Sequence, residues 1–210
     1  MNLPSMEAAV WAVLEEYEAR AAREEEMWDK MSPQEAEERI DEMLLPVGRA
    51  TGSLINLLAK EACARRILEV GSSFGYSTVW LAEAARAVGG KVTSLELRSA
   101  KTEYASLKLA RAGLAGYVDF VVGDALESLA SLDGPFDLVL IDLWKNLYVP
   151  VFGLLHPKLA PGALIVADNM LEPASARPHA QAYRHAVHVA RDMSSVLLPV
   201  GNGIELSRYQ

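Results

Sequence analysis

The spacing of apolar residues along the chain changes near residue 66. Before this point the spacing is helical, and we expect helices over residues 4–28, from Ser32 to just before Pro46, and over residues 48–62. The segment Ser32-Pro33-Gln34-Glu35 marks the start of the second helix, because it combines a capping box with proline at the first helical position. These helices have no strand partners. We expect them to cap the rest of the chain, with the charged residues 15–26 as a solvated face.

From residue 66 onward, short apolar runs alternate with helical patterns. Strands are expected at residues 67–70, 91–96, 118–122, 136–141, 163–167, 195–199 and 204–208, and helices at residues 76–87, 100–112, 124–132, 149–159 and 179–191. The turn Gly201-Asn202-Gly203 predicts that the last two strands form a hairpin.

This alternation predicts an α/β fold. We expect a doubly wound, Rossmann-like, mostly parallel sheet with an antiparallel C-terminal hairpin, helices on both faces and an N-terminal helical cap. The chain is predicted to be one domain over residues 1–210, with the cap at residues 1–62 and the α/β core at residues 63–210.

A glycine-containing turn follows the first strand, in the sequence Glu69-Val70-Gly71-Ser72-Ser73-Phe74-Gly75. Glycines at such a turn let the backbone approach a nucleotide cofactor. The G-x-x-x-G spacing departs from the dinucleotide pattern G-x-G-x-x-G. Glu69, at the strand end, would repel a pyrophosphate but favour a cationic amino acid moiety. Together these features point to S-adenosylmethionine.

Further polar residues follow the later strands. Glu96 ends the second strand, where an acid typically binds ribose hydroxyls. Asp124 follows the third strand, and either caps the next helix or contacts the adenine, or does both. Trp144, after the fourth strand, either stacks on a base or packs.

Two aspartates and one asparagine follow two buried strands: Asp142, Asp168 and Asn169. Their oxygen atoms suit a hard divalent cation such as Mg²⁺. Each aspartate alone could instead cap a helix, and Asn169 could lie in a turn. Lys145 lies three residues after Asp142 and can act as a general base when a nearby cation and burial favour its neutral form.

Composition narrows the class of protein. With 51% hydrophobic and 23% charged residues we expect a soluble globular protein, and a net charge of -8 argues against nucleic acid as a partner. We find no apolar run of about 20 residues, so no membrane span is expected. A single cysteine, Cys63, is expected to be packed and inert, and with the absence of a signal-peptide pattern it indicates the cytoplasm.

In order, the segments EVGSSFGYS, Glu96, GDA, DLWKNLY and ADN resemble the class I, cation-dependent O-methyltransferases, in particular the catechol O-methyltransferase-like family. The resemblance runs from about Val47 to the NGIELSRY tail. Two features depart from it: Leu143 replaces a small residue or histidine, and the segment LEPASARPHAQAYRH lacks a Trp-Arg-Gly-like continuation. Both belong to the expected wall of the acceptor pocket.

The resemblance implies transfer of a methyl group to one hydroxyl of a metal-chelated, catechol-like small molecule. It implies Mg²⁺, Mn²⁺ or Ca²⁺ on Asp142, Asp168 and Asn169, Lys145 as the base, and Glu205 near a substrate hydroxyl. A homodimer through the N-terminal helices is a further implication. The implied S-adenosylmethionine site comprises Val47, Glu69, Gly71, Ser73, Ser77, Glu96, Leu97, Asp124, Ala125, Asp142 and Trp144.

Two other functions stay open from the sequence. One is a metal-independent methyltransferase acting on another small natural product, which chelators would not inhibit. The other is a noncatalytic S-adenosylmethionine-binding or interaction protein, which would bind the donor without turnover.

Overall fold

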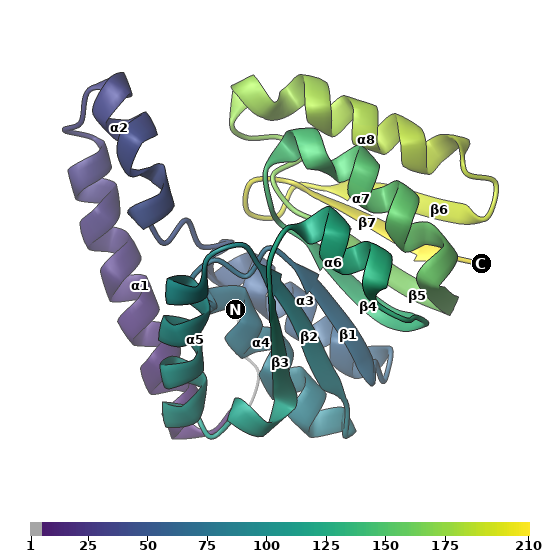
Figure 1. The fold of residues 1–210 in the computed structure, drawn as a ribbon, viewed down its shortest axis with the longest axis horizontal. Coiled ribbons are helices and arrows are strands. Elements are labelled where there is room, and N and C mark those ends of the chain that lie inside the picture. Colours follow the sequence, from purple (N-terminus) through teal and green to yellow (C-terminus); the bar gives the residue numbers. More distant parts are fainter. Residues whose placement is uncertain (1–5) are drawn as a thin grey trace.

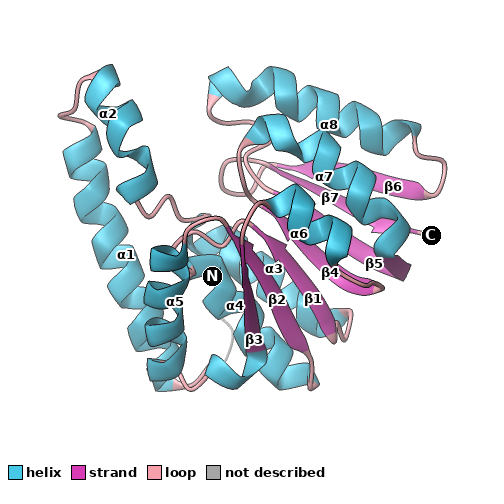
Figure 2. Cartoon of the chain, viewed as in Figure 1, coloured by secondary structure: helices cyan, strands magenta, loops and turns pink. Residues whose placement is uncertain are grey.

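The computed structural model describes residues 6–210, in which helices surround a seven-stranded sheet (Figure 1; Figure 2). The helices are α1 (Ala8–Trp28), α2 (Pro33–Arg39), α3 (Gly48–Glu61), α4 (Tyr76–Val88), α5 (Ser99–Arg111), α6 (Ala125–Ser131), α7 (Tyr148–Leu155) and α8 (Arg177–Val189). The strands are β1 (Arg66–Val70), β2 (Lys91–Glu96), β3 (Val118–Val122), β4 (Phe136–Ile141), β5 (Leu159–Ala167), β6 (Met193–Leu198) and β7 (Ile204–Tyr209). Short 3₁₀ helices are η1 (Ile40–Glu42), η2 (Ala115–Tyr117), η3 (Lys145–Leu147), η4 (His156–Lys158) and η5 (Ala174–Ala176).

The strand order is β3-β2-β1-β4-β5-β7-β6. The pairs among β1 to β5 are parallel, whereas β7 runs antiparallel to both β5 and β6. The predicted fold class is therefore confirmed, including the C-terminal hairpin. Because β1 and β4 are neighbours whose connections leave in opposite directions along the sheet, the residues that follow them form a crevice for a ligand.

Two hydrophobic clusters fill the two faces of the sheet. One joins α1, α3 and α4 to the sheet around the fully buried Tyr17 and Trp80. The other joins α7 and α8 to the opposite face around Tyr148 and Tyr183. The stripe predicted for the first helix, which comprises Val10, Val13, Leu14 and Tyr17, is buried as expected. Since α1 shares this core, the division into cap and core at residue 62 stays a prediction.

The second helix, expected to run to just before Pro46, ends as α2 at Arg39 and is followed only by η1. Three further local expectations were wrong. The helix expected at residues 149–159 ends at Leu155, because Pro157 has no N–H to continue it, and Leu159 already begins β5. Cys63 is exposed with a φ of 50°: the Ala64 N–H bonds to Ala59 O and the Cys63 N–H to Lys60 O, the pattern of a helix C-terminus that turns this side chain outward.

The last wrong expectation concerns the charged stretch 15–26, which is not simply a solvated face. Glu16 binds Lys108 and Arg111 of α5, Glu18 binds Arg49, and Arg20 binds Glu24. The predicted helix over residues 4–28 begins at Ala8 in the described chain; residues 4 and 5 lie outside the described residues. Within residues 6–210, none of the helices has the length and apolar character needed to cross a membrane.

Helices α3 and α4 pack closely because Gly52 has no side chain. A Cβ built on Gly52 would lie 2.6 Å from both Cδ1 and Cε2 of Trp80, whose indole is fully buried. Gly153 in α7 is the opposite case, since a Cβ there would meet no atom within 4 Å.

We expect the same substitution to have opposite effects at these two helical glycines. Gly52→Ala should lower the free energy of unfolding by about 1–3 kcal/mol through overpacking against Trp80. Gly153→Ala should raise it by about 0.5–1 kcal/mol, because alanine loses less backbone entropy in a helix. Urea unfolding followed by circular dichroism measures both values. Stabilisation by both variants would contradict the tight α3–α4 contact.

Candidate functional site

A cavity of about 810 Å³ lies at the carboxyl edge of the parallel strands. Its walls come from the ends of β1, β2, β3, β4 and β5, from the end of α1 with η1, and from the start of α8. The sequence-predicted residues among its lining are Gly71, Ser73, Glu96, Leu97, Asp124, Ala125, Asp142, Trp144, Lys145, Asp168 and Asn169. Val47 and Ser77 line a small adjoining cavity that shares Gly71, Ser73 and Asp142 with it.

The turn after β1 depends on Gly71 and Gly75, which have φ angles of 96° and 93°. A Cβ on Gly71 would collide with the carbonyl oxygen of Asp142, so the turn and the end of β4 touch through bare backbone. The Gly71 and Ser72 N–H groups bond to Leu95 O at 3.0 and 3.1 Å, which ties the turn to β2 as well. A rigid turn of this kind can hold a ligand against its backbone.

Glu69 lies beneath this turn. Its carboxylate is fully buried and accepts hydrogen bonds from the hydroxyls of Ser77, Thr78 and Ser94, each at 2.6 Å. Burial raises the pKa of Glu69 to about 7, although the three hydroxyl bonds act in the opposite direction. Among the described residues that line either cavity, Glu69 is absent while Ser77 is present. Direct contact between Glu69 and a ligand stays a prediction. The hydrogen bond that Glu69 accepts from Ser77 orients the Ser77 hydroxyl.

Glu96 and Asp124 occupy the next two strand ends. Glu96 accepts from the Ser73 N–H at 2.9 Å and from the Arg98 N–H at 3.0 Å, so each carboxylate oxygen keeps a further lone pair for a ligand hydroxyl. Asp124 caps α6 by accepting from the Leu126 and Glu127 N–H groups, and it also lines the cavity. Both interpretations of Asp124 are thus compatible.

Asp142, Asp168 and Asn169 meet at the ends of β4 and β5, which are parallel neighbours. Asp168 is only 1% exposed, and its Oδ1 is buried without a hydrogen-bond partner. Burial, followed by repulsion from Asp142, raises the pKa of Asp168. Asn169 has a φ of 57°, a left-handed turn that asparagine tolerates.

This donor set fits a divalent cation. Within the described part of the chain, no group of three His, Cys, Asp or Glu side chains is placed to hold a metal ion, but here an amide oxygen can be the third ligand. A cation would pair the orphaned Asp168 oxygen and offset the repulsion between the two carboxylates. The buried, unpaired oxygen is otherwise costly.

Lys145 lies beside these aspartates. Its Nζ donates to Asp142 Oδ1 at 3.3 Å, to Leu143 O at 3.0 Å and to the hydroxyl of Tyr148 at 2.7 Å. In its ammonium form the lysine has an acceptor for each N–H, and in its neutral form it offers a lone pair to a proton. Tyr148 is fully buried, and its hydroxyl donates toward Ile141 O at 3.0 Å and Asp168 O at 3.2 Å. It therefore joins Lys145 to both strand ends.

Glu205 is placed differently from its implied role. Its side chain is fully buried on β7, where it pairs with Arg184 at 2.8 Å, and His188 of α8 lies 3.5 Å away. It is not among the described residues that line either cavity. The geometry therefore does not bring Glu205 to the acceptor side, because α8 covers it and supplies the arginine.

The cavity walls include residues that the strand-end motifs did not reveal. They come from loops and helix ends without a recognisable pattern: Trp28, Ile40, Asp41, Leu45, Pro46, Arg98, Lys101 and Asn202. Leu143, Pro173, Ala176 and His179 belong to the segments that were expected to form the acceptor wall, and they do line the cavity. Tyr148 was also missed; its place as the last residue of the DLWKNLY segment was the available signal.

Comparisons with known proteins agree with this geometry. A family model described as a methyltransferase domain matches residues 68–170. A catechol O-methyltransferase of Mycobacterium tuberculosis is 41% identical over 128 residues, which cover 60% of this chain and 58% of that enzyme. The chain therefore matches less than two thirds of that relative's own length.

Two further relatives are matched over more of their length. Caffeoyl-CoA O-methyltransferase 2 of Eucalyptus globulus is 30% identical over 79% of this chain and 75% of its own. The crystal structure of the O-methyltransferase TomG from Streptomyces achromogenes, in complex with S-adenosylmethionine, has a TM-score of 0.77 and 28% identity and covers 98% of this chain and 91% of its own. The chain belongs to the class I, S-adenosylmethionine-dependent O-methyltransferases of the catechol O-methyltransferase-like family.

Proposed function

We propose that the protein transfers the methyl group of S-adenosylmethionine to one hydroxyl of a small molecule that carries vicinal hydroxyls. The main support for this proposal is the buried, unpaired Asp168 oxygen beside Asp142, in a cavity that is also lined by the turn of Gly71 and by Glu96 with its free lone pairs. Family membership supports the same reaction. The homodimer and the cytoplasmic location stay predictions.

The donor occupies the end of the cavity formed by β1, β2 and β3 in this proposal. Glu96 accepts hydrogen bonds from the ribose hydroxyls, and the turn at Asp124 and Ala125 meets the adenine. Ser77, held by Glu69, and Ser73 lie toward the methionine end with Val47. Leu97 and Trp144, which are 60% and 56% exposed, supply apolar surface that a bound donor would cover.

The acceptor occupies the end near β4 and β5. Asp142, Asp168 and Asn169 hold Mg²⁺ or a similar divalent cation there. When bound, such a cation lowers the pKa of a hydroxyl that coordinates it. The protein's part is to fix the two strand ends so that an acceptor hydroxyl faces the donor methyl group, since proximity and alignment can contribute several kcal/mol, about 7–11 at most.

Lys145 takes the hydroxyl proton in this mechanism. Its Nζ is held between Asp142 and Tyr148, on the cavity wall. The acceptor oxygen then attacks the methyl carbon in line with the sulfur, the carbon–sulfur bond breaks, and S-adenosylhomocysteine leaves. The apolar residues Leu143, Trp144 and Pro173 on the same wall exclude water from this step.

Asp168→Asn tests the cation site, because it keeps the shape of the side chain and removes its charge. We expect at least about a tenfold loss of Mn²⁺ affinity, measured by titration calorimetry on the ligand-free protein, with S-adenosylhomocysteine affinity nearly unchanged. Asp119→Asn, at an exposed aspartate of β3, is the control and should bind Mn²⁺ like the wild type. Equal Mn²⁺ affinity of Asp168→Asn and the wild type would refute the assignment.

Asp142→Ala is expected to abolish methyl transfer while leaving donor binding largely intact, because it removes the second carboxylate of the same set. The readouts are radiolabelled methyl transfer and equilibrium binding of S-adenosylhomocysteine. Unchanged transfer would rule out Asp142 as a cation ligand.

Lys145→Met is expected to lower kcat by about 100-fold or more, because general bases contribute on this scale. Mn²⁺ and S-adenosylhomocysteine affinities should be retained, since methionine preserves the apolar stem. Lys91→Met, at an exposed lysine of β2, serves as the matched control with wild-type kcat. A kcat within twofold of the wild type in Lys145→Met would exclude the lysine as the base.

A further inference from the structure

We propose that Arg20 of α1 is a positioning residue for the donor site, an inference that rests on the proposed function. Arg20 contacts two separate segments that border the cavity: residues 42–47, from the last residue of η1 to the start of α3, and the turn of residues 71–75 after β1. Donor-binding residues lie on both segments, with Val47 on the first and Gly71 and Ser73 on the second.

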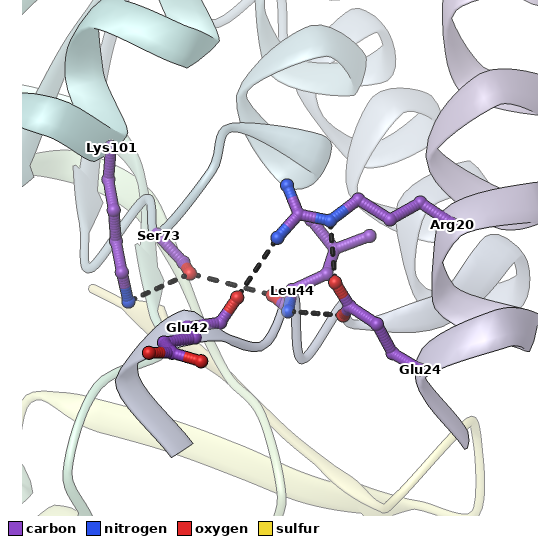
Figure 3. Close-up of polar contacts among 6 residues, drawn as sticks. All are labelled: Arg20, Glu24, Glu42, Leu44, Ser73 and Lys101. Atoms are coloured by element: carbon purple, nitrogen blue, oxygen red, sulfur yellow. Dashed lines mark hydrogen bonds and ion pairs between the residues drawn. The ribbon is translucent and has the colours of Figure 1, made fainter. Parts of the chain in front are cut away.

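Residues 43–47 have no regular secondary structure, so side chains must supply hydrogen bonds for their backbone. Arg20 Nη2 donates to Glu42 O at 3.0 Å, and the Leu44 N–H donates to Glu24 Oε2 at 2.7 Å (Figure 3). Arg20 Nε in turn donates to Glu24 Oε1 at 2.6 Å. One ion pair on α1 therefore fixes the backbone on both sides of Met43.

Leu45 follows directly after the backbone that Arg20 and Glu24 bind. Leu45 has a φ of 43°, an unfavourable angle for a leucine, and its 51% exposed side chain lines both cavities. Its neighbours Met43 and Leu44 are buried. A strained residue that faces a ligand site persists only where its surroundings fix it.

Arg20 also contacts the turn after β1. Its guanidinium lies 4.1 Å from the centre of the Phe74 ring, and the hydroxyl of Tyr17, one helical turn earlier on α1, donates to Phe74 O at 2.6 Å. The two segments are also joined directly, because Ser73 Oγ lies 3.5 Å from Leu44 O and Lys101 Nζ lies 3.5 Å from Ser73 Oγ (Figure 3).

The ion pair of Arg20 and Glu24 is partly buried. The side chains of Arg20 and Glu24 are only 20% and 17% exposed, so solvent competes weakly with their bonds. Tyr17, Arg20 and Glu24 are three and four residues apart, which places them on one face of α1. Without Arg20, residues 42–47 would sample other conformations, and only a fraction of the molecules would present a preformed donor site.

Arg20→Ala is the test, with Arg23→Ala as the matched control, because Arg23 is exposed on the same helix and makes no ion pair among residues 6–210. Titration calorimetry with S-adenosylhomocysteine, without acceptor or cation, should show at least about a tenfold weaker Kd for Arg20→Ala and an unchanged Kd for Arg23→Ala. Arg20→Lys should restore only part of the affinity, because lysine lacks the planar fork that reaches both partners and stacks on Phe74.

Two further readouts separate positioning from a loss of folded protein. In the ligand-free Arg20→Ala variant, the amides of residues 42–47 should exchange hydrogen faster while those of β1 and β4 keep their protection. With an active acceptor, the KM for the donor should rise, whereas a smaller folded fraction would lower only the apparent kcat. If Arg20→Ala does not fold, Glu24→Gln takes its place, since it keeps an acceptor for Leu44 and removes the ion pair.

The outcomes are distinguishable from those for the proposed function. If the wild type binds S-adenosylhomocysteine and Arg20→Ala binds it equally well, the role of Arg20 is overturned and the proposed function stands. If the wild type does not bind it, the proposed function fails, and the role of Arg20 in donor binding fails with it.

Discussion

At Gly71 the turn after β1 and the end of β4 touch through backbone alone, and both halves of the site depend on this contact. A side chain at Gly71 would collide with the Asp142 carbonyl oxygen. On one side of the contact lie the turn and Glu96, which suit a nucleoside. On the other lie Asp142, Lys145 and Asp168. The parallel pairing of β2, β1, β4 and β5 brings these residues to one edge of the sheet.

The buried carboxylates near this edge are compensated in different ways, and the difference indicates their roles. Glu69 accepts three hydroxyl bonds, so it is satisfied without a ligand and acts as a support for Ser77. Asp168 keeps an oxygen without a partner next to a second carboxylate. Since an unpaired buried oxygen destabilises the fold, the imbalance at Asp168 supports the proposed cation site.

The sequence predicted most of the fold, because strand and helix periodicities in the core are strong and the glycine turn is distinctive. It also predicted which strand-end residues converge, since the carboxyl ends of parallel strands share an edge. The end of α7 was predicted too late, because a short 3₁₀ turn that contains Pro157 precedes β5. The cavity walls at Trp28, Leu45 and Asn202 could not be predicted, because loop conformation decides which side chains face the cavity. For the same reason, the ion pair of Arg20 and Glu24 looked like part of a solvated surface. The sequence also contained no pattern to indicate that Arg184 pairs with Glu205.

Methyl transfer to a vicinal diol with help from a divalent cation is the reaction proposed for this cavity. The most direct test measures transfer from labelled S-adenosylmethionine to a small panel of catechols, once with Mg²⁺ and once with EDTA. We predict a monomethylated product that forms with Mg²⁺ and disappears with EDTA. Product formation that EDTA leaves unchanged would contradict the role assigned to Asp142, Asp168 and Asn169, and no product from any catechol, with donor binding intact, would contradict the proposed class of acceptor.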